Sequence, residues 1–124
     1  MPGPVVFAEL LQGRLDPDQI RWQPFRQGVE IARLYGGAPN AASAALLRYE
    51  PRASVPRHIH HGYEHILVLS GSQRDENGVY EAGSLLISEP GSSHAIASDE
   101  GCVVLAIWEK PVEILEPSPE KSAK

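Results

Sequence analysis

Residues 58–71 read HIHHGYEHILVLSG and place four of the chain's five histidines within eight residues. His58 and His60 are two residues apart, so on a β-strand their side chains lie on the same face. Glu64 follows four residues later and can return to that face beyond an intervening glycine. His94 comes directly after a second turn, PGSS. If the strand that begins at His94 runs beside the first, three imidazoles and one carboxylate converge inside a barrel.

This set of side chains indicates a metal site. Neutral ring nitrogens together with one hard oxygen suit first-row divalent ions. We therefore predict one divalent metal ion, with Zn or Fe as first choices and Mn, Ni or Co as alternatives, held by His58, His60, Glu64 and His94. No separate general base or nucleophile stands out, so the catalytic residues are left unassigned.

The remaining histidines and the single cysteine are expected outside the site. His61 lies one residue out of phase with the ligands, which predicts an exposed turn residue. His65 should face away from Glu64, at the surface or at a subunit contact. Cys102 opens an apolar strand and is expected to be a buried, inert thiol. Residues 75–77 (DEN) are expected to form only a hairpin turn, without chemistry.

The rest of the chain predicts an all-β domain. With 11 Gly and 11 Pro in 124 residues, little room remains for long helices. Residues 41–49 (AASAALLRY) contain helix-favouring Ala and Leu, but flanking prolines and strand-like neighbours favour a buried strand. Short strands separated by turn residues are typical of a sandwich or a closed barrel. We predict strands at 28–35, 41–49, 64–70, 79–81, 84–88, 94–98 and 102–109.

We expect a single domain over residues 1–115. Its N-terminal segment, 1–27, would pack on the barrel or, through the apolar stretch 5–11, add to a neighbouring subunit's sheet, and we expect a homodimer. Residues 116–124 (EPSPEKSAK) hold two prolines and no large apolar side chain, which predicts a disordered tail.

Charge and composition exclude several functions. The net charge is −5 and no Lys or Arg cluster occurs, so nucleic-acid and membrane-surface binding are not expected. One cysteine cannot form an internal disulfide, which fits a reducing compartment. The sequence shows no signal-peptide pattern and no apolar run of membrane-spanning length, so we expect a cytoplasmic protein.

The histidine region also resembles a known family. H-I-H-H-G-Y-E, six residues and then Gly71 resembles the first cupin motif, and Gly83 followed by PGSSH resembles the second. The family's glycine before the first histidine is Arg52 here, its first-position proline of motif two is Glu89, and its terminal asparagine is Ser98. The resemblance implies a double-stranded β-helix, or jelly-roll barrel.

A closer resemblance covers residues 22–108. The segments WQPFRQGVEIARLY, VPRHIHHGYEHILVLSG, DENGVYEAG and PGSSHAIASDEGC are similar to the cupin domain of ChrR-type anti-sigma factors. It implies that His58, His60, Glu64 and His94 are the metal ligands. The family usually has a second acid where this chain has His65. Its anti-sigma domain depends on a His and Cys cluster, and no cysteine precedes Cys102 here, so an anti-sigma role is not carried over.

Three functions are compatible with this sequence. The metal pocket could bind or sense a small molecule, with Arg33, Arg48 and Arg57 as candidates for holding an anionic ligand. Alternatively, open positions on the ion could support a dioxygenase, lyase or isomerase reaction on an enolisable substrate such as a diketone. In the third case the ion serves folding alone. Whether the protein is an enzyme is left open.

Overall fold

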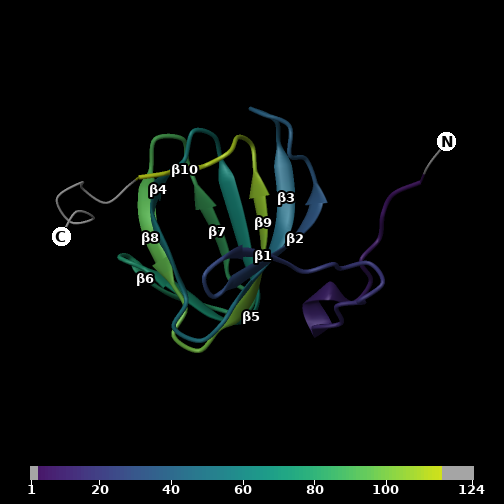
Figure 1. The fold of residues 1–124 in the computed structure, drawn as a ribbon. Coiled ribbons are helices and arrows are strands. Elements are labelled where there is room, and N and C mark those ends of the chain that lie inside the picture. Colours follow the sequence, from purple (N-terminus) through teal and green to yellow (C-terminus); the bar gives the residue numbers. More distant parts are fainter. Residues whose placement is uncertain (1–2, 116–124) are drawn as a thin grey trace.

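The computed structural model describes residues 3–115, which form ten strands and one short 3-10 helix (Figure 1). The elements are η1 (Leu10–Gln12), β1 (Gln23–Arg26), β2 (Val29–Tyr35), β3 (Ser43–Tyr49), β4 (Ser54–Ile59), β5 (Glu64–Asp75), β6 (Gly78–Glu81), β7 (Leu85–Ser88), β8 (Ser93–Ala97), β9 (Cys102–Trp108) and β10 (Glu113–Ile114). The all-β prediction is confirmed. The tail predicted at 116–124 lies outside the described residues.

The strands form one antiparallel sheet that curls on itself. Their order is β1-β2-β3-β9-β5-β8-β4-β10, with β6 and β7 also paired to β5. β5 is longer than the predicted strand 64–70, because it continues past an irregularity at Val68/Ser70 to pair with β6 and β8. Gly71 lies at this bend with φ +72°, and a Cβ there would collide with the Gly101 carbonyl. The strand can therefore turn the barrel's corner only with glycine at this position.

The segment of ambiguous propensity, 41–49, forms the buried strand β3. It lies between β2 and β9, and its central residues 44–47 are all buried. Leu47 points into the barrel core with Val68 and Val104. Leu46 points to the opposite face, which the N-terminal segment covers. Burial on both faces thus overrides the intrinsic helix preference of Ala and Leu.

The N-terminal segment lies against the outer face of the sheet. Ile20 is buried there beside Leu46, and Phe7, Leu15 and Trp22 pack against the same cluster. Residues 5–11 form no strand, and a left-handed Glu9 leads into the 3-10 turn instead. No helix within residues 3–115 has the length and apolar character needed to cross a membrane.

Candidate metal centre

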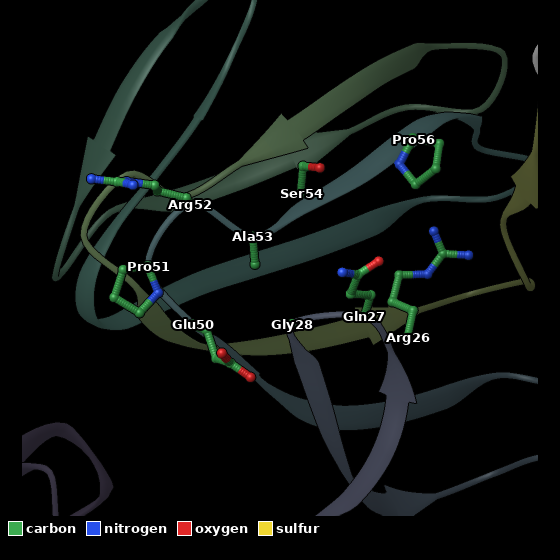
Figure 2. A pocket seen from close by; sticks show the side chains of 9 residues that line it. All are labelled: Arg26, Gln27, Gly28, Glu50, Pro51, Arg52, Ala53, Ser54 and Pro56. Carbon is green, nitrogen blue, oxygen red and sulfur yellow. The ribbon is translucent and has the colours of Figure 1, made fainter.

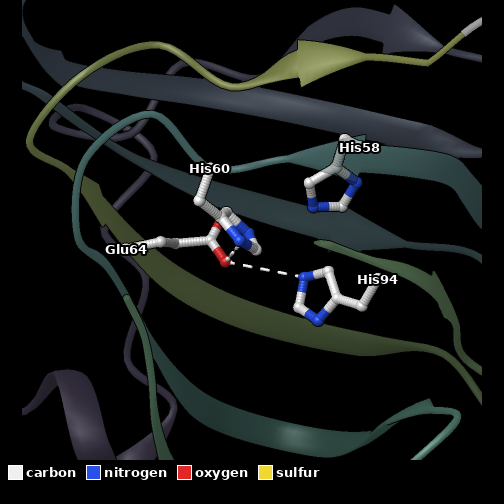
Figure 3. A group of neighbouring side chains, drawn as sticks. All are labelled: His58, His60, Glu64 and His94. Atoms are coloured by element: carbon white, nitrogen blue, oxygen red, sulfur yellow. Dashed lines mark ion pairs between the residues drawn. The ribbon is translucent and has the colours of Figure 1, made fainter. Parts of the chain in front are cut away.

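The four predicted ligands come together inside the barrel (Figure 3). His58 lies on β4 directly opposite His94 on β8, because the two residues are paired in register. His60 follows the end of β4, and Glu64 is the first residue of β5. One ligand atom from each residue lies within 4.8 Å of the others, and the four residues are only 1–5% exposed.

The inward-facing atoms of this cluster lack hydrogen-bond partners. His60 Nε2, His94 Nε2 and Glu64 Oε1 are all buried without one among the described residues. Nε2 of His60 lies 3.0 Å from Glu64 Oε1 without the alignment of a hydrogen bond, and Nε2 of His94, at 3.7 Å, is too far away for one. A buried polar atom left unpartnered costs about 1–3 kcal/mol. A cation bound between these atoms would satisfy all three, so the residues fit a metal ion.

By contrast, Nδ1 of each of the three histidines faces away from the cluster and contacts an oxygen atom of another residue. His58 Nδ1 lies 3.0 Å from the Pro56 carbonyl oxygen, and His60 Nδ1 lies 3.0 Å from both the carbonyl and Oγ of Ser92. His94 Nδ1 lies 3.2 Å from Asp75 Oδ2. Such contacts fix the ring orientation of metal-binding histidines and leave Nε2 for the ion.

Glu64 is held in the same way. Its Oε2 accepts a hydrogen bond of 2.8 Å from the indole nitrogen of Trp108, which leaves Oε1 directed at the histidines. Burial alone would raise the pKa of Glu64, but His60 and the Trp108 hydrogen bond lower it overall. Burial lowers the pKa of His58. A deprotonated carboxylate and a neutral imidazole are the forms that bind metal.

Asp75 is a site residue that the sequence analysis missed. Its side chain is 4% exposed, and besides His94 it accepts hydrogen bonds of 2.8 Å from the Tyr80 hydroxyl and from the Asn77 backbone N–H. The expectation that residues 75–77 only form a turn is wrong for Asp75. It is the last residue of β5 and shares the inward face with Gln73, so the alternation along a longer strand would have identified it.

The predicted bystanders lie outside the cluster. His61 is exposed and lies 2.8 Å from Glu113 Oε1, and Cys102 is buried, which raises the pKa of its thiol. His65 is half-buried on the outer face and lines a surface pocket of about 370 Å³. Two of the three arginines expected to hold an anion already bind a carboxylate: Arg48 binds Glu30 and Arg57 binds Glu76.

Comparisons with known proteins agree with this architecture. The model of the ChrR Cupin-like domain family matches residues 12–112. The anti-sigma-E factor ChrR of Cereibacter sphaeroides is 33% identical over 111 residues, which cover 88% of this chain and 50% of ChrR. The chain therefore spans about half the length of the curated relative it matches.

Solved structures show the same fold. The structure of Rhodobacter sphaeroides SigE in complex with the anti-sigma ChrR matches with a TM-score of 0.65 and 29% identity, over 86% of this chain and 70% of that chain. An RmlC-like cupin protein of Ralstonia eutropha matches with a TM-score of 0.73 and 23% identity, over 84% and 72%. An acetylacetone dioxygenase from Acinetobacter johnsonii matches with a TM-score of 0.75 and 14% identity, over 94% and 80%. At these identities the last two show the fold alone.

Proposed function

Because the chain belongs to the ChrR cupin-like domain family, we propose that its barrel binds one divalent metal ion and uses it to bind or sense a small molecule. His58, His60, Glu64 and His94 would be the ligands. The observation that carries the proposal is the set of three buried, unpartnered atoms on His60, Glu64 and His94 that face one another across the site. An apolar or hydrogen-bonded core would not leave such atoms together.

A bound divalent ion would supply Lewis acidity toward an oxygen or nitrogen atom of the small molecule. Four protein ligands leave two positions on a six-coordinate ion, where a small molecule or water could bind. The chain's own residues set the site in advance: Pro56, Ser92 and Asp75 hold the imidazole rings, and Trp108 holds the carboxylate.

Metal analysis of the purified protein tests this function. We expect one Zn or Fe ion per chain in the wild type, measured by inductively coupled plasma mass spectrometry. His94→Ala should lose the ion because one of four ligands is removed. The matched control is His61→Ala, an exposed histidine outside the cluster, which should keep it. Equal metal content in both variants, or no metal in the wild type after growth with added Zn and Fe, would contradict the proposal.

A metal-dependent dioxygenase is the second candidate function. It is favoured by the two open positions that four ligands leave on a six-coordinate ion, and acetylacetone dioxygenases share the fold. It predicts that the iron-loaded protein consumes oxygen with acetylacetone and that His94→Ala abolishes the uptake. A zinc-containing protein without oxygen uptake supports binding or sensing instead.

A structural ion is the remaining alternative, and the low exposure of the four ligands favours it. In this case removal of the metal should unfold the protein, because a structural ion contributes directly to the folding free energy. Treatment with EDTA followed by far-UV circular dichroism separates the possibilities. An unchanged spectrum and melting temperature after loss of the metal would exclude the structural role.

A further inference from the structure

A second pocket lies where β1, at one end of the strand order, faces β4, which is next to the other end. Here a pocket of about 600 Å³ separates the β1–β2 hairpin from the start of β4 (Figure 2). Its volume is within the range of small-molecule sites. Arg26, Gln27 and Gly28 line it from the hairpin, and Ala53, Ser54 and Pro56 line it from β4 and the preceding loop. We call it the seam pocket.

The strands beside the seam pocket keep an unpaired edge. Within the part of the chain that the structure describes, β1 pairs only with β2. β4 pairs with β8 on one side, and on its other side β10 reaches only His58 and Ile59. Residues 54 and 55 pair with β8, but residues 54–56 have no strand partner on the side that faces the pocket. Free strand edges present backbone donors and acceptors that a bound molecule can use.

Two arginines line the seam pocket, Arg26 and Arg52, and neither has an acidic partner among residues 3–115. Arg14, Arg48, Arg57 and Arg74 each form an ion pair with a carboxylate. Arg26 forms no ion pair with any residue between 3 and 115. Its guanidinium lies over the Phe25 ring, 6.0 Å from the ring centroid. In Figure 2 the side chains of Arg26 and Gln27 both point toward Pro56, across the gap.

The other two charged residues of the pocket, Glu50 and Arg52, do not occupy the end where Arg26 and Gln27 lie. Glu50 lines the other end of the pocket, and its carboxylate points downward in Figure 2, away from Ser54 and Pro56. Arg52 also lines the pocket, but its side chain extends in the opposite direction from Arg26. The end formed by Arg26 and Gln27 thus combines one cation with an amide donor. In a chain of net charge −5, this guanidinium does not belong to a general positive surface.

The seam pocket is also adjacent to the metal centre. Pro56 lines the pocket, and its carbonyl oxygen holds Nδ1 of the metal-ligand candidate His58 at 3.0 Å. The buried Tyr49 is near enough to both regions to respond to each: burial raises the pKa of its hydroxyl, Glu64 adds to this rise and Arg26 opposes it. A molecule bound in the pocket would therefore lie next to the wall that carries His58.

We propose that the seam pocket binds a small organic acid, whose carboxylate is held by the Arg26 guanidinium and the Gln27 amide. A guanidinium offers two parallel N–H donors that match the two oxygens of a carboxylate. The organic part of the acid would lie against Ala53 and Pro56. Binding of the acid stands without the metal, but its role as the molecule that the barrel senses rests on the proposed function.

The test is a calorimetric titration of the as-purified protein with benzoate, neutral benzamide and inorganic phosphate, with metal content measured on the same sample. We expect benzoate to bind and benzamide to bind at least about tenfold more weakly, because the charge-assisted hydrogen bonds are lost. Arg26→Gln should weaken benzoate at least about tenfold as well. Arg21→Gln, which removes the same charge from an exposed side chain outside the pocket, should leave the affinity unchanged.

Several outcomes would overturn the proposal: no benzoate binding, equal affinity in Arg26→Gln and the wild type, or binding of phosphate alone. Arg26→Lys guards against a folding defect, since it keeps the charge and should bind with intermediate affinity while melting like the wild type. Benzoate binding by a protein without metal would contradict the proposed function but not the seam pocket. Metal binding without benzoate binding would contradict the seam-pocket proposal but not the proposed function.

Discussion

Replacing Asp75 by Asn should weaken metal binding without touching any of the four ligands. The Asp75 carboxylate lies 3.2 Å from His94 Nδ1, on the side of the ring opposite the atom that would bind the ion. The carboxylate holds the His94 ring in one orientation, and its negative charge makes Nε2 a stronger ligand for the metal ion. Substitution keeps the size of the side chain but removes the charge.

The expected loss follows from the role of such partners. Mutation of a group that orients a metal-binding histidine costs about 10–100-fold in affinity, which corresponds to about 1.4–2.7 kcal/mol. Asp75→Asn keeps an oxygen that can accept from Nδ1, so we expect the lower end, about tenfold. Asp75→Ala removes the contact altogether and should approach the upper end.

Competition with a chromophoric zinc chelator measures the affinity directly. The matched control is Asp99→Asn, which removes the same charge from an exposed side chain that pairs with Arg74. Asp99→Asn should bind zinc like the wild type. If Asp75→Asn also binds zinc within about twofold of the wild type, the reasoning from the Asp75–His94 contact is refuted.

Three further predictions concern stability and assembly. Gly71→Ala should lower the free energy of unfolding, measured by urea denaturation, by about 2 kcal/mol or more, because φ is +72° and the new Cβ meets the Gly101 carbonyl. Gly83→Ala should lower it less, because φ is +95° there but the new Cβ meets open space. A similar loss in both would contradict the steric argument. The pKa of Glu76 is lowered to about 2 by its own backbone N–H and by Arg57, so the stability it contributes is present above its unfolded pKa, near 4.5, and is lost as the pH falls toward 2. The advantage of the wild type over Glu76→Gln should accordingly shrink across this interval, and a constant difference would refute it. The homodimer expected from the sequence predicts a sedimentation mass twice the 13.5 kDa of the chain, and a monomer mass at micromolar concentration excludes it.

The sequence predicted the cluster well because its geometry is local. His58, His60 and Glu64 lie within seven residues. The alternation of side chains along a strand predicts that the two histidines share a face, and the turn at Gly62 allows Glu64 to return to it. His94 required a strand pairing, and the second turn motif supplied it. β3 was predicted for a similar reason, since prolines and turn residues bound the segment on either side.

The missed residues depend on contacts that no local pattern specifies. Asp75 reaches His94 only because β5 continues past Gly71 and meets β8, whereas the sequence analysis interpreted Gly71 as a turn and ended the strand at residue 70. Trp108 reaches Glu64 because β9 and β5 pair in register. Arg26 became a candidate only when the structure showed that it lines the seam pocket and has no acidic partner among residues 3–115. Partner choice among exposed charges is a property of the folded surface.

The pairing of β4 has a consequence for the local unfolding of this strand. β4 is attached to β8 through an irregular ladder and to β10 through two residue pairs, and part of its edge toward the seam pocket is unpaired. An ion held by His58 and His60 on one side and by Glu64 and His94 on the other would join this strand to β5 and β8. Amide hydrogen exchange in β4 would then proceed mainly through states in which the ion has left. Local unfolding of one strand and release of the metal would be a single event.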